Sequence, residues 1–526
     1  MKINRRAFVQ GMPLAATSAL AFGQGKGLAP LPGGHASKRK RRTIYFNDAR
    51  HYYLFVFEPP MALEDAWRPI DEAAGTAVDT FVYGVERGDG LFYPSKVGMR
   101  FGQNIQPFDF AAFWRVWHNM QSLIDRGLDP LTVLIDRAHA KGMDFFASLR
   151  MSSYGGIDPK LTVPKGGKGL AHQEVRDHQF SVLEELATRY NVEGVELDFA
   201  AAPGGMPLIL RKEDAAAFTP VITEYVRKIS KMVRGRSGKP GQVGARVYPL
   251  EKICLTFGLD VRTWLKEGLV DYVAPMLYSD FNLNPDLPIE WLIQEAHAAN
   301  VPVYGVIQPY AGDESSGTSH DSPKRVHVTP EIMRAAAANY WALGVDGLYA
   351  WFLRWPLGAP ERQLLTELAD PDLIKEANKK YVVRRATKEA TEMGYEAALP
   401  LKIPSADASK RHPIPFHIAD DMTQATERIR QVLLRIEIDN LVSADRLTIL
   451  LNGKSLAGEV CLRDYGNRVA PYESQWLEFQ LRQVKLQKGK NLLEISLDKR
   501  PANLKAGIEV QRVEVCVEYG SYPSRL

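Results

Sequence analysis

The chain has 526 residues, of which 45% are hydrophobic and 24% are charged, a composition typical of soluble globular proteins. This length exceeds that of one ordinary domain and predicts two. The net charge is +4, but residues 1–42 carry nine basic and no acidic residues, so the rest of the chain has a charge of −5. Because the basic residues are confined to one end, the charge gives no support for a nucleic-acid partner.

Residues 1–42 are expected to form an export signal and a basic linker. The run Asn4–Gln10 (Asn-Arg-Arg-Ala-Phe-Val-Gln) resembles the twin-arginine consensus. The mildly apolar stretch Gly11–Gly23 is too short to span a bilayer core of about 30 Å, and Ser18–Ala21 offers small residues for cleavage. The sequence therefore predicts a periplasmic or extracellular protein with no membrane span after cleavage; the alternative is a disordered basic tail.

Strand-length apolar runs alternate with amphipathic stretches along the first two thirds of the chain. Residues 43–369 thus read as a (β/α)8 barrel of about 300 residues, in the α/β class. A doubly wound open sheet is the alternative, disfavoured because the first strand is followed by Asn47-Asp-Ala-Arg-His51 instead of a glycine-rich turn. The predicted strands cover residues 43–47, 78–85, 144–150, 194–199, 252–259, 272–278, 303–307 and 347–352.

Beyond the barrel the pattern changes. Residues 370–395 are charged and predict a helical connector, whereas residues 396–526 alternate with period two and predict an accessory β-sandwich. The Asn452-Gly453 pair favours a hairpin turn, because it tolerates the positive φ angles of a type I′ turn. Tyr472 and Trp476 are candidates for a sugar-binding platform, with sheet core as the alternative.

The fourth predicted strand contains two carboxylates, Glu196 and Asp198, at alternate positions. Alternate residues of a strand share a face, so both should point into the barrel. Buried acids are costly without partners, and a barrel keeps its active site at the carboxyl ends of its strands. This pair is therefore the first candidate for chemistry, with a structural salt-bridge network as the alternative.

Nearly every other predicted strand also ends in polar or aromatic residues. Acids at these ends suit glycosidic cleavage, which needs one carboxyl group to protonate the leaving oxygen and another to attack or activate water. Aromatic side chains suit stacking on the apolar faces of sugar rings, although each could equally be core. The candidates are Asp260 and Asp280 as further catalytic acids, and Asp48, Glu86, Arg150, Tyr278, Gln308, Tyr310, Trp351 and Arg354 as substrate-binding residues.

Strand position suggests a role for each acid. Asp198, at the very end of its strand, is the expected nucleophile or general base. Asp280 is the expected proton donor, and Asp260 is the reserve candidate for that role. Glu196, one layer deeper, is expected to orient Asp198 or to hydrogen-bond Arg150. Arg150 is expected to keep Asp198 ionised.

Several segments resemble the bacterial glycoside-hydrolase-like proteins once grouped as hydrolase-like family 10. These segments are Glu174-Val-Arg-Asp177, Arg189–Phe199, Trp264–Tyr278, Tyr83–Gly90 and Ser148–Ser152. The resemblance covers about residues 43–360 and implies a barrel that acts on a carbohydrate. A more distant resemblance to the chitinase-type strand-4 motif matches Glu193, Glu196 and Asp198, but the position of the chitinase proton donor holds Ala200.

The sequence predicts no cofactor and no catalytic metal. The histidines show no H-x-H or H-E-x-x-H spacing, and the three cysteines show neither disulfide nor zinc spacing. The leading hypothesis is an exported glycoside hydrolase with a carbohydrate substrate. Two alternatives stay open: a noncatalytic carbohydrate-binding barrel, supported by Ala200 and by Gln308 where many retaining barrel hydrolases carry glutamate, and a structural envelope protein.

Overall fold

A computed structural model describes most of the chain beyond the predicted leader. The described residues are 41–48, 53–87, 90–152, 156–200, 209–278, 282–311, 326–351, 356–385, 387–407, 409–422, 427–464 and 474–521. Within these ranges, no helix is both long enough and apolar enough to cross a membrane. Residues 1–40 of the predicted leader and linker and the candidates Tyr472, Asp280 and Arg354 lie outside them, whereas Arg42 belongs to the first strand of the barrel.

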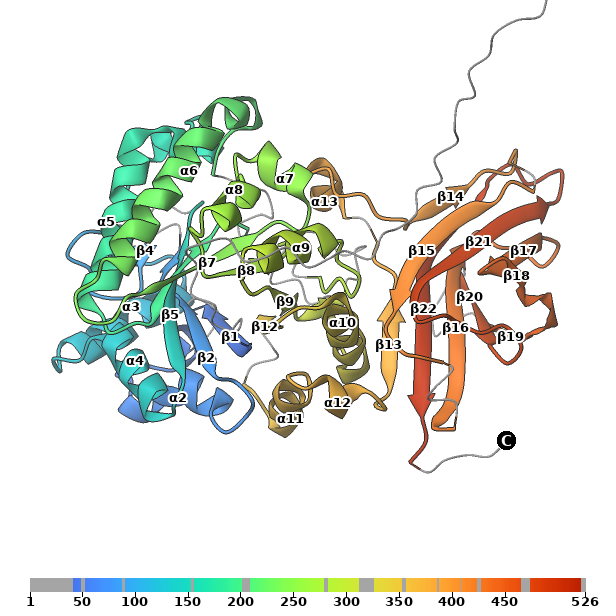
Figure 1. Ribbon diagram of the computed structural model, residues 1–526, viewed down its shortest axis with the longest axis horizontal. Coiled ribbons are helices and arrows are strands. Elements are labelled where there is room, and N and C mark those ends of the chain that lie inside the picture. Colours follow the sequence, from blue (N-terminus) through green and yellow to red (C-terminus); the bar gives the residue numbers. More distant parts are fainter. Residues whose placement is uncertain are drawn as a thin grey trace, which may run out of the picture. The chain divides into compact units, whose positions relative to one another are not determined.

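Eight parallel strands form the first domain in the order β8-β7-β6-β5-β2-β1-β12-β9 (Figure 1). The outermost strands of this order also meet, since the Val273 N–H donates to the Pro302 carbonyl at 3.1 Å and Val273 pairs with Val303. The sheet is therefore a closed barrel, as predicted, and the open-sheet alternative is wrong. The strands are β1 (Arg42–Asp48), β2 (Thr80–Gly84), β5 (Asp144–Arg150), β6 (Gly194–Asp198), β7 (Gln242–Val247), β8 (Tyr272–Pro275), β9 (Tyr304–Ile307) and β12 (Gly347–Trp351).

Helices connect the strands, and local sequence signals define where several begin and end. Asp129 caps one helix by accepting a hydrogen bond from the Leu131 N–H, and Gly344, at φ +97°, ends another. The barrel helices are α1 (Tyr53–Val56), α2 (Leu63–Ala73), α3 (Ala111–Ile124), α4 (Pro130–Ala140), α5 (Gln173–Arg189), α6 (Lys212–Arg234), α7 (Glu251–Thr256), α8 (Val261–Lys266), α9 (Glu290–Ala298), α10 (Pro330–Leu343) and α11 (Ala359–Glu367).

One predicted strand is wrong. Residues 252–259 fall in helix α7 and the turn that follows it, while the fifth barrel strand is β7, ten residues earlier. The error arises because residues 252–259 are more apolar than residues 242–247. They owe that character to packing of the helix, since Ile253 and Cys254 are buried against the barrel core.

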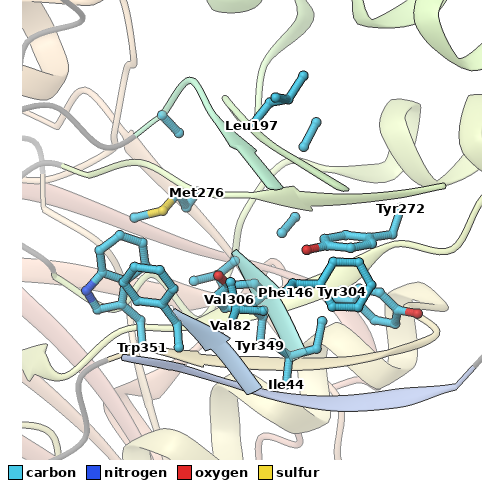
Figure 2. Close-up of a cluster of buried hydrophobic side chains, with 14 of the residues drawn as sticks. Ile44, Val82, Phe146, Leu197, Tyr272, Met276, Tyr304, Val306, Tyr349 and Trp351 are labelled. Carbon is cyan, nitrogen blue, oxygen red and sulfur yellow. The ribbon is translucent and has the colours of Figure 1, made fainter. Parts of the chain in front are cut away.

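The barrel interior is apolar over much of its length. Figure 2 shows Ile44, Val82, Phe146, Tyr304 and other side chains gathered there, all buried. Aromatic rings meet edge to face, as between Phe146 and Tyr272 with ring centroids 5.6 Å apart. Polar side chains in such surroundings need hydrogen-bond or ion-pair partners within the barrel, and this requirement applies to the two acids of β6.

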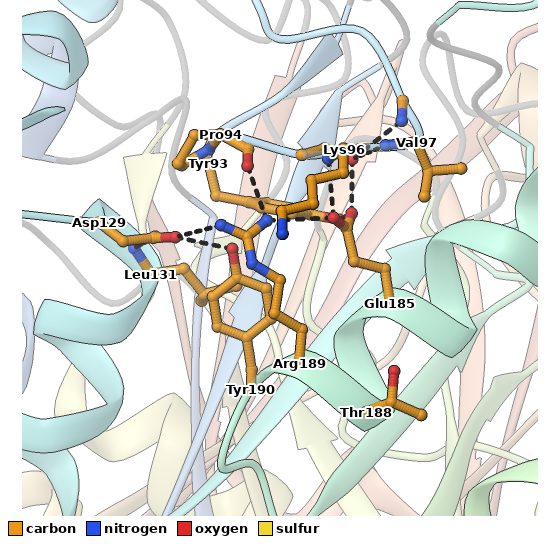
Figure 3. A network of polar contacts seen from close by, with 12 residues as sticks. Tyr93, Pro94, Lys96, Val97, Asp129, Leu131, Glu185, Thr188, Arg189 and Tyr190 are labelled. Atoms are coloured by element: carbon orange, nitrogen blue, oxygen red, sulfur yellow. Dashed lines mark hydrogen bonds and ion pairs between the residues drawn. The ribbon is translucent and has the colours of Figure 1, made fainter.

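A long segment joins β2 to α3 and begins with the hairpin of β3 (Glu86–Arg87) and β4 (Gly90–Leu91). Farther along, Glu185 of α5 binds this segment (Figure 3). Its carboxylate accepts hydrogen bonds from the Tyr93 hydroxyl at 3.2 Å and from the Lys96 N–H at 2.7 Å, and it pairs with Arg189 at 3.1 Å. Tyr93 is thus a packing residue, with no exposed surface.

The second domain is a β-sandwich, as predicted. One six-stranded sheet has the order β13-β22-β16-β20-β19, with β14 also paired to β22, and a four-stranded sheet has the order β15-β21-β17-β18. The strands are β13 (Lys379–Val382), β14 (Leu401–Ile403), β15 (His412–Ile418), β16 (Ile429–Asp439), β17 (Arg446–Leu451), β18 (Lys454–Ser455), β19 (Val460–Asp464), β20 (Ser474–Gln480), β21 (Gly489–Lys499) and β22 (Ile508–Tyr519). Two two-residue strands, β10 (Tyr310–Ala311) and β11 (Val326–His327), pair with each other beyond β9.

The predicted helical connector is only partly helical. Residues 370–395 contain the short helices α12 (Pro371–Ile374) and α13 (Lys388–Glu392), but also strand β13, which pairs with β22. The charged run that suggested a helix includes Lys379 and Lys380 of that strand, whose ammonium groups pair with Asp420 and Glu514. The predicted hairpin is confirmed, since Asn452 and Gly453 have φ angles of 52° and 77° between β17 and β18.

Candidate active site

Three neighbouring strands carry charged residues at one level of the barrel. Arg150, the last residue of β5, is in register with Asp198, the last residue of β6, and Asp198 is in register with Arg246 of β7. One guanidinium nitrogen of Arg246 lies 2.8 Å from Asp198 Oδ2. Because these strands are parallel, the three side chains lie at the carboxyl end of the barrel, where barrel enzymes keep their active sites.

The row of charges continues onto a fourth strand. Arg150 forms an ion pair with Asp48, the last residue of β1, and both side chains are buried. Acidic and basic groups therefore alternate from Asp48 through Arg150 and Asp198 to Arg246. Each buried charge has an opposite charge as a neighbour, which such groups need in an apolar interior.

Glu196 lies one layer deeper and is surrounded by donors. Its carboxylate accepts hydrogen bonds from the hydroxyls of Ser148 at 2.8 Å, Tyr272 at 2.9 Å and Tyr349 at 3.1 Å. Arg246 Nε lies 3.0 Å from the same carboxylate. The three hydroxyls come from β5, β8 and β12 and the ion-paired guanidinium comes from β7, so Glu196 ties four other barrel strands to β6.

Two neighbouring aromatic rings, with centroids 4.3 Å apart, also pack against Arg246. Its guanidinium carbon lies 4.1 Å from the ring centroid of Phe46 and 4.1 Å from that of Trp351. Cation–π contacts of this kind hold a guanidinium most strongly where water is excluded. Arg246 has no exposed surface, so it is fixed by two aromatic rings and two carboxylates.

The electrostatic environment follows from this geometry. Burial lowers the pKa of Arg246, but the charges of Asp198 and Glu196 outweigh burial and raise it overall. Arg150 shows the same balance, with burial opposed first by Asp48 and then by Tyr278 and Asp198, so its pKa is also raised. Both arginines therefore stay charged at any pH at which the protein is folded.

Four further predicted site residues lie beyond the ends of other barrel strands. Tyr278 follows β8 and makes an edge contact with Trp351, with ring centroids 6.3 Å apart. Gln308 follows β9, and its amide donates to the Leu277 carbonyl at 2.9 Å. Glu86 is buried at the start of β3. Tyr310, in β10, packs on His327 at a centroid distance of 5.0 Å.

Asp260 has a local role. It precedes α8 and caps that helix, since its carboxylate accepts hydrogen bonds from the Thr263 N–H at 3.0 Å and from the Thr263 hydroxyl at 2.7 Å. It does not end a strand, because the strand predicted before it is a helix. Of the four predicted acids, the structure brings Glu196 and Asp198 together, while Asp280 lies outside the described residues.

Sequence reasoning missed Arg246, Ser148, Tyr272 and Tyr349. Arg246 was missed because its strand was placed at residues 252–259. A usable signal was present, since α6 ends at Arg234 and the turn-forming Lys239-Pro-Gly241 leads directly into Gln242–Val247. Among the described residues, no group of three or more histidine, cysteine, aspartate or glutamate side chains could hold a metal ion.

Comparison with known proteins gives no family assignment. No family model matches the chain, and no curated protein matches it. Solved structures similar to this one include the PgaB (BpsB) glycoside hydrolase domain of Bordetella bronchiseptica, at 14% identity and a TM-score of 0.40 over 63% of this chain and 99% of that one. Another is the endo-β-1,4-mannanase of Thermotoga petrophila, at 12% identity and a TM-score of 0.41 over 91% and 98%.

An α-L-fucosidase from Vibrio sp. strain EJY3 matches at 10% identity and a TM-score of 0.38, over 89% of this chain and 90% of that chain. These proteins are glycoside hydrolases by their descriptions. At such low identities and TM-scores the similarities carry no argument about the chemistry of this chain, so any function must be argued from its own residues.

Proposed function

We propose that this chain is an exported glycoside hydrolase that cleaves a poly- or oligosaccharide with two carboxyl groups. The observation that carries the proposal is the position of Asp198. It ends β6 at the carboxyl end of the barrel, and its charge is compensated by Arg246 at 2.8 Å and by the nearby Arg150. Glycosidic cleavage needs a carboxylate of this kind to attack the anomeric carbon or to activate water.

Asp198 is the better candidate of the two acids on β6. All four donors around Glu196 belong to the barrel itself, which gives that carboxylate a structural task. Asp198 lies one layer nearer the end of the strand. We assign the proton donor to Asp280, which follows β8 in the sequence, and β8 lies two places from β6 in the barrel order.

A second candidate function has its own supporting observation. Asp198 has no exposed surface and is already bound by Arg246 and by the Ala200 N–H at 3.2 Å. A barrel that only binds carbohydrate would keep such an arrangement, because no carboxylate would need to reach a reacting atom.

The two functions are separated by measuring the release of reducing ends. Leader-free protein is incubated with plant, algal and microbial polysaccharides beside Asp198→Asn and beside Asp136→Asn, which changes an exposed aspartate of α4. A hydrolase loses release with Asp198→Asn, by a factor of about 10² or more, and keeps it with Asp136→Asn. Glycan binding without release in all three proteins would instead support the binding barrel.

The sandwich offers a possible second contact with carbohydrate. Trp476 lies on the outer face of the larger sheet, between the inward-facing residues of β20, and Arg435 lies over its ring at 4.5 Å. Arg435 also pairs with Glu478 at 2.9 Å. We propose that this half-exposed ring supports sugar binding, which predicts that Trp476→Ala weakens retention on the polysaccharide without changing hydrolysis of short fragments.

Export is the remaining part of the proposal and rests on Arg5 and Arg6. Fusion of residues 1–42 to a folded reporter should send the reporter out of the cytoplasm, and replacement of both arginines by lysine should stop it. If the reporter fused to unaltered residues 1–42 stays in the cytoplasm, export is contradicted, but the proposed hydrolysis is unaffected.

A further inference from the structure

We infer that Arg246 is a positioning residue for Asp198, and that Glu196 helps to orient Asp198 by holding Arg246. This inference rests on the proposed function, because it assigns Asp198 the chemical role. It adds a residue that neither the strand pattern nor the family resemblance identified.

The first observation is the way in which one guanidinium joins the two acids. Nε of Arg246 faces Glu196 at 3.0 Å, while one terminal nitrogen faces Asp198 at 2.8 Å and also donates to the Ser148 hydroxyl at 3.1 Å. Both contacts with the carboxylates are ion pairs, so one extended guanidinium neutralises two acids on neighbouring layers, which the compact charge of an ammonium does less well.

The second observation is that Arg246 has little freedom to move. Phe46 and Trp351 both pack against its guanidinium at 4.1 Å, with their own ring centroids 4.3 Å apart, and Glu196 is itself held by three hydroxyls. The rigidly held guanidinium of Arg246 therefore sets the orientation of the Asp198 carboxylate. A reacting group displaced by about 1 Å can lose about 10²-fold in rate, so such rigidity has a direct catalytic use.

The third observation concerns charge. The groups that face or electrostatically influence Asp198 are Arg246 on β7, Tyr248 just after that strand, Arg150 on β5, Tyr349 on β12 and Glu196 on β6 itself. Arg246 is the only cation among them that an ion pair joins to Asp198 in the described part of the chain. Its removal should therefore make protonation of Asp198 easier, because an adjacent cation favours the ionised carboxylate.

The test compares Arg246→Lys, Arg246→Met and Arg246→Ala with Arg42→Lys. Arg42 is the matched control, because it is buried at the opposite end of the barrel and pairs with Asp144 at 2.6 Å. We expect Arg246→Lys to lower kcat by about 10²-fold with KM changed less than about 3-fold. In Arg246→Met the acid limb of the pH profile should move up by about one unit or more. Arg42→Lys should lower Tm and leave the pH profile in place.

Chemical rescue separates positioning from loss of folding. Guanidinium at low millimolar concentration should restore part of the activity of Arg246→Ala, whereas urea, which is equally planar but uncharged, should not. Rescue by urea as well, an unchanged kcat in folded Arg246→Lys, or an unchanged pH profile in folded Arg246→Met would overturn the inference. If Arg246→Ala does not fold, the kcat of Arg246→Lys and the pH profile of Arg246→Met decide.

A further measurement is independent of activity. In protein labelled with ¹³C at aspartate side chains, the carboxyl resonance that is missing from Asp198→Asn identifies Asp198. If the wild-type protein releases no sugar, the proposed function fails. The inference about Arg246 then stands or falls on whether that resonance titrates at higher pH in Arg246→Met than in the wild-type protein.

Discussion

The ring of Tyr272 fills the space that a side chain at Gly244 would occupy. A Cβ atom at Gly244 would lie 2.0 Å from Cζ of that ring and 2.3 Å from its hydroxyl oxygen, far inside any allowed contact. Gly244 is in register with Glu196, and the ring reaches across this gap to donate its hydroxyl to the Glu196 carboxylate at 2.9 Å. The hydrogen bond between β8 and β6 thus depends on the absence of a side chain on β7.

Gly244→Ala should therefore destabilise the barrel by displacing Tyr272. We expect Tm to fall by several degrees, because overpacking of a rigid core costs about 1–3 kcal/mol and the buried hydrogen bond is lost as well. The variant Tyr272→Ala makes room for the new methyl group. In that background Gly244→Ala should cost much less, and additive losses in the double variant would contradict the explanation.

Glu196→Gln tests the structural role given to the deeper acid. The substitution keeps the shape of the side chain but leaves Arg246 with one carboxylate fewer and places an amide N–H₂ group opposite the donors. Loss of one member of a buried ion pair costs about 3–5 kcal/mol, so we expect a large fall in the urea midpoint. The exposed Glu213→Gln on α6 is the control and should leave the midpoint unchanged.

The sandwich should become less stable in acid through Glu459. Burial raises the pKa of this carboxyl, but hydrogen bonds from the backbone N–H groups of Val484, Arg482 and Gln483 outweigh burial and lower its pKa overall. A carboxyl whose folded pKa is depressed stabilises the fold above its unfolded pKa, and this contribution is lost as the pH falls through the folded pKa.

Glu459→Gln removes this contribution. The Tm difference between the wild-type protein and the variant should be largest near neutral pH and should shrink as the pH falls below about 4. Glu427→Gln, at an exposed position of the same domain, should show no such trend. A difference that stays constant with pH would mean that the three backbone contacts do not depend on the charge of Glu459.

Glu185 should control how tightly the long segment between β2 and α3 is held. Its carboxylate receives the Tyr93 hydroxyl and the Lys96 N–H, both from that segment, as well as the Arg189 guanidinium (Figure 3). Glu185→Ala should therefore speed hydrogen exchange at residues 93–98 by at least tenfold, while exchange in β6 stays slow. Equal acceleration in β6 would indicate general loosening of the barrel.

The barrel was predictable because its strands carry the expected signals. β5 and β6 are short apolar runs bounded by helices, and the acids of β6 follow the two-residue period of a strand. The same reasoning paired Glu196 and Asp198 correctly. It failed at β7, which lacks the apolar character of a strand because the Tyr272 ring takes the place of a side chain at Gly244 and because Arg246 serves the acids of β6.

The partners of the acids were not predictable for a different reason. Ser148 and Tyr349 are distant in the sequence, and each reads as an ordinary strand residue until the strands are closed into a barrel. Only that closure brings them to Glu196. The proposed partner of Arg150 was Asp198 or Glu196, whereas its ion pair is with Asp48, on a strand two places away in the barrel order.

The sharing of one guanidinium by Glu196 and Asp198 has a consequence for the evolution of this chain. Loss of Arg246 leaves two buried carboxylates without the cation they share, whereas loss of one acid leaves Arg246 paired with the other, so single changes at position 246 should be the rarest of the three. Lineages that have abandoned the chemistry should have replaced all three together with neutral residues. Co-variation of these three columns, once many homologous sequences are aligned, would record the history of the site.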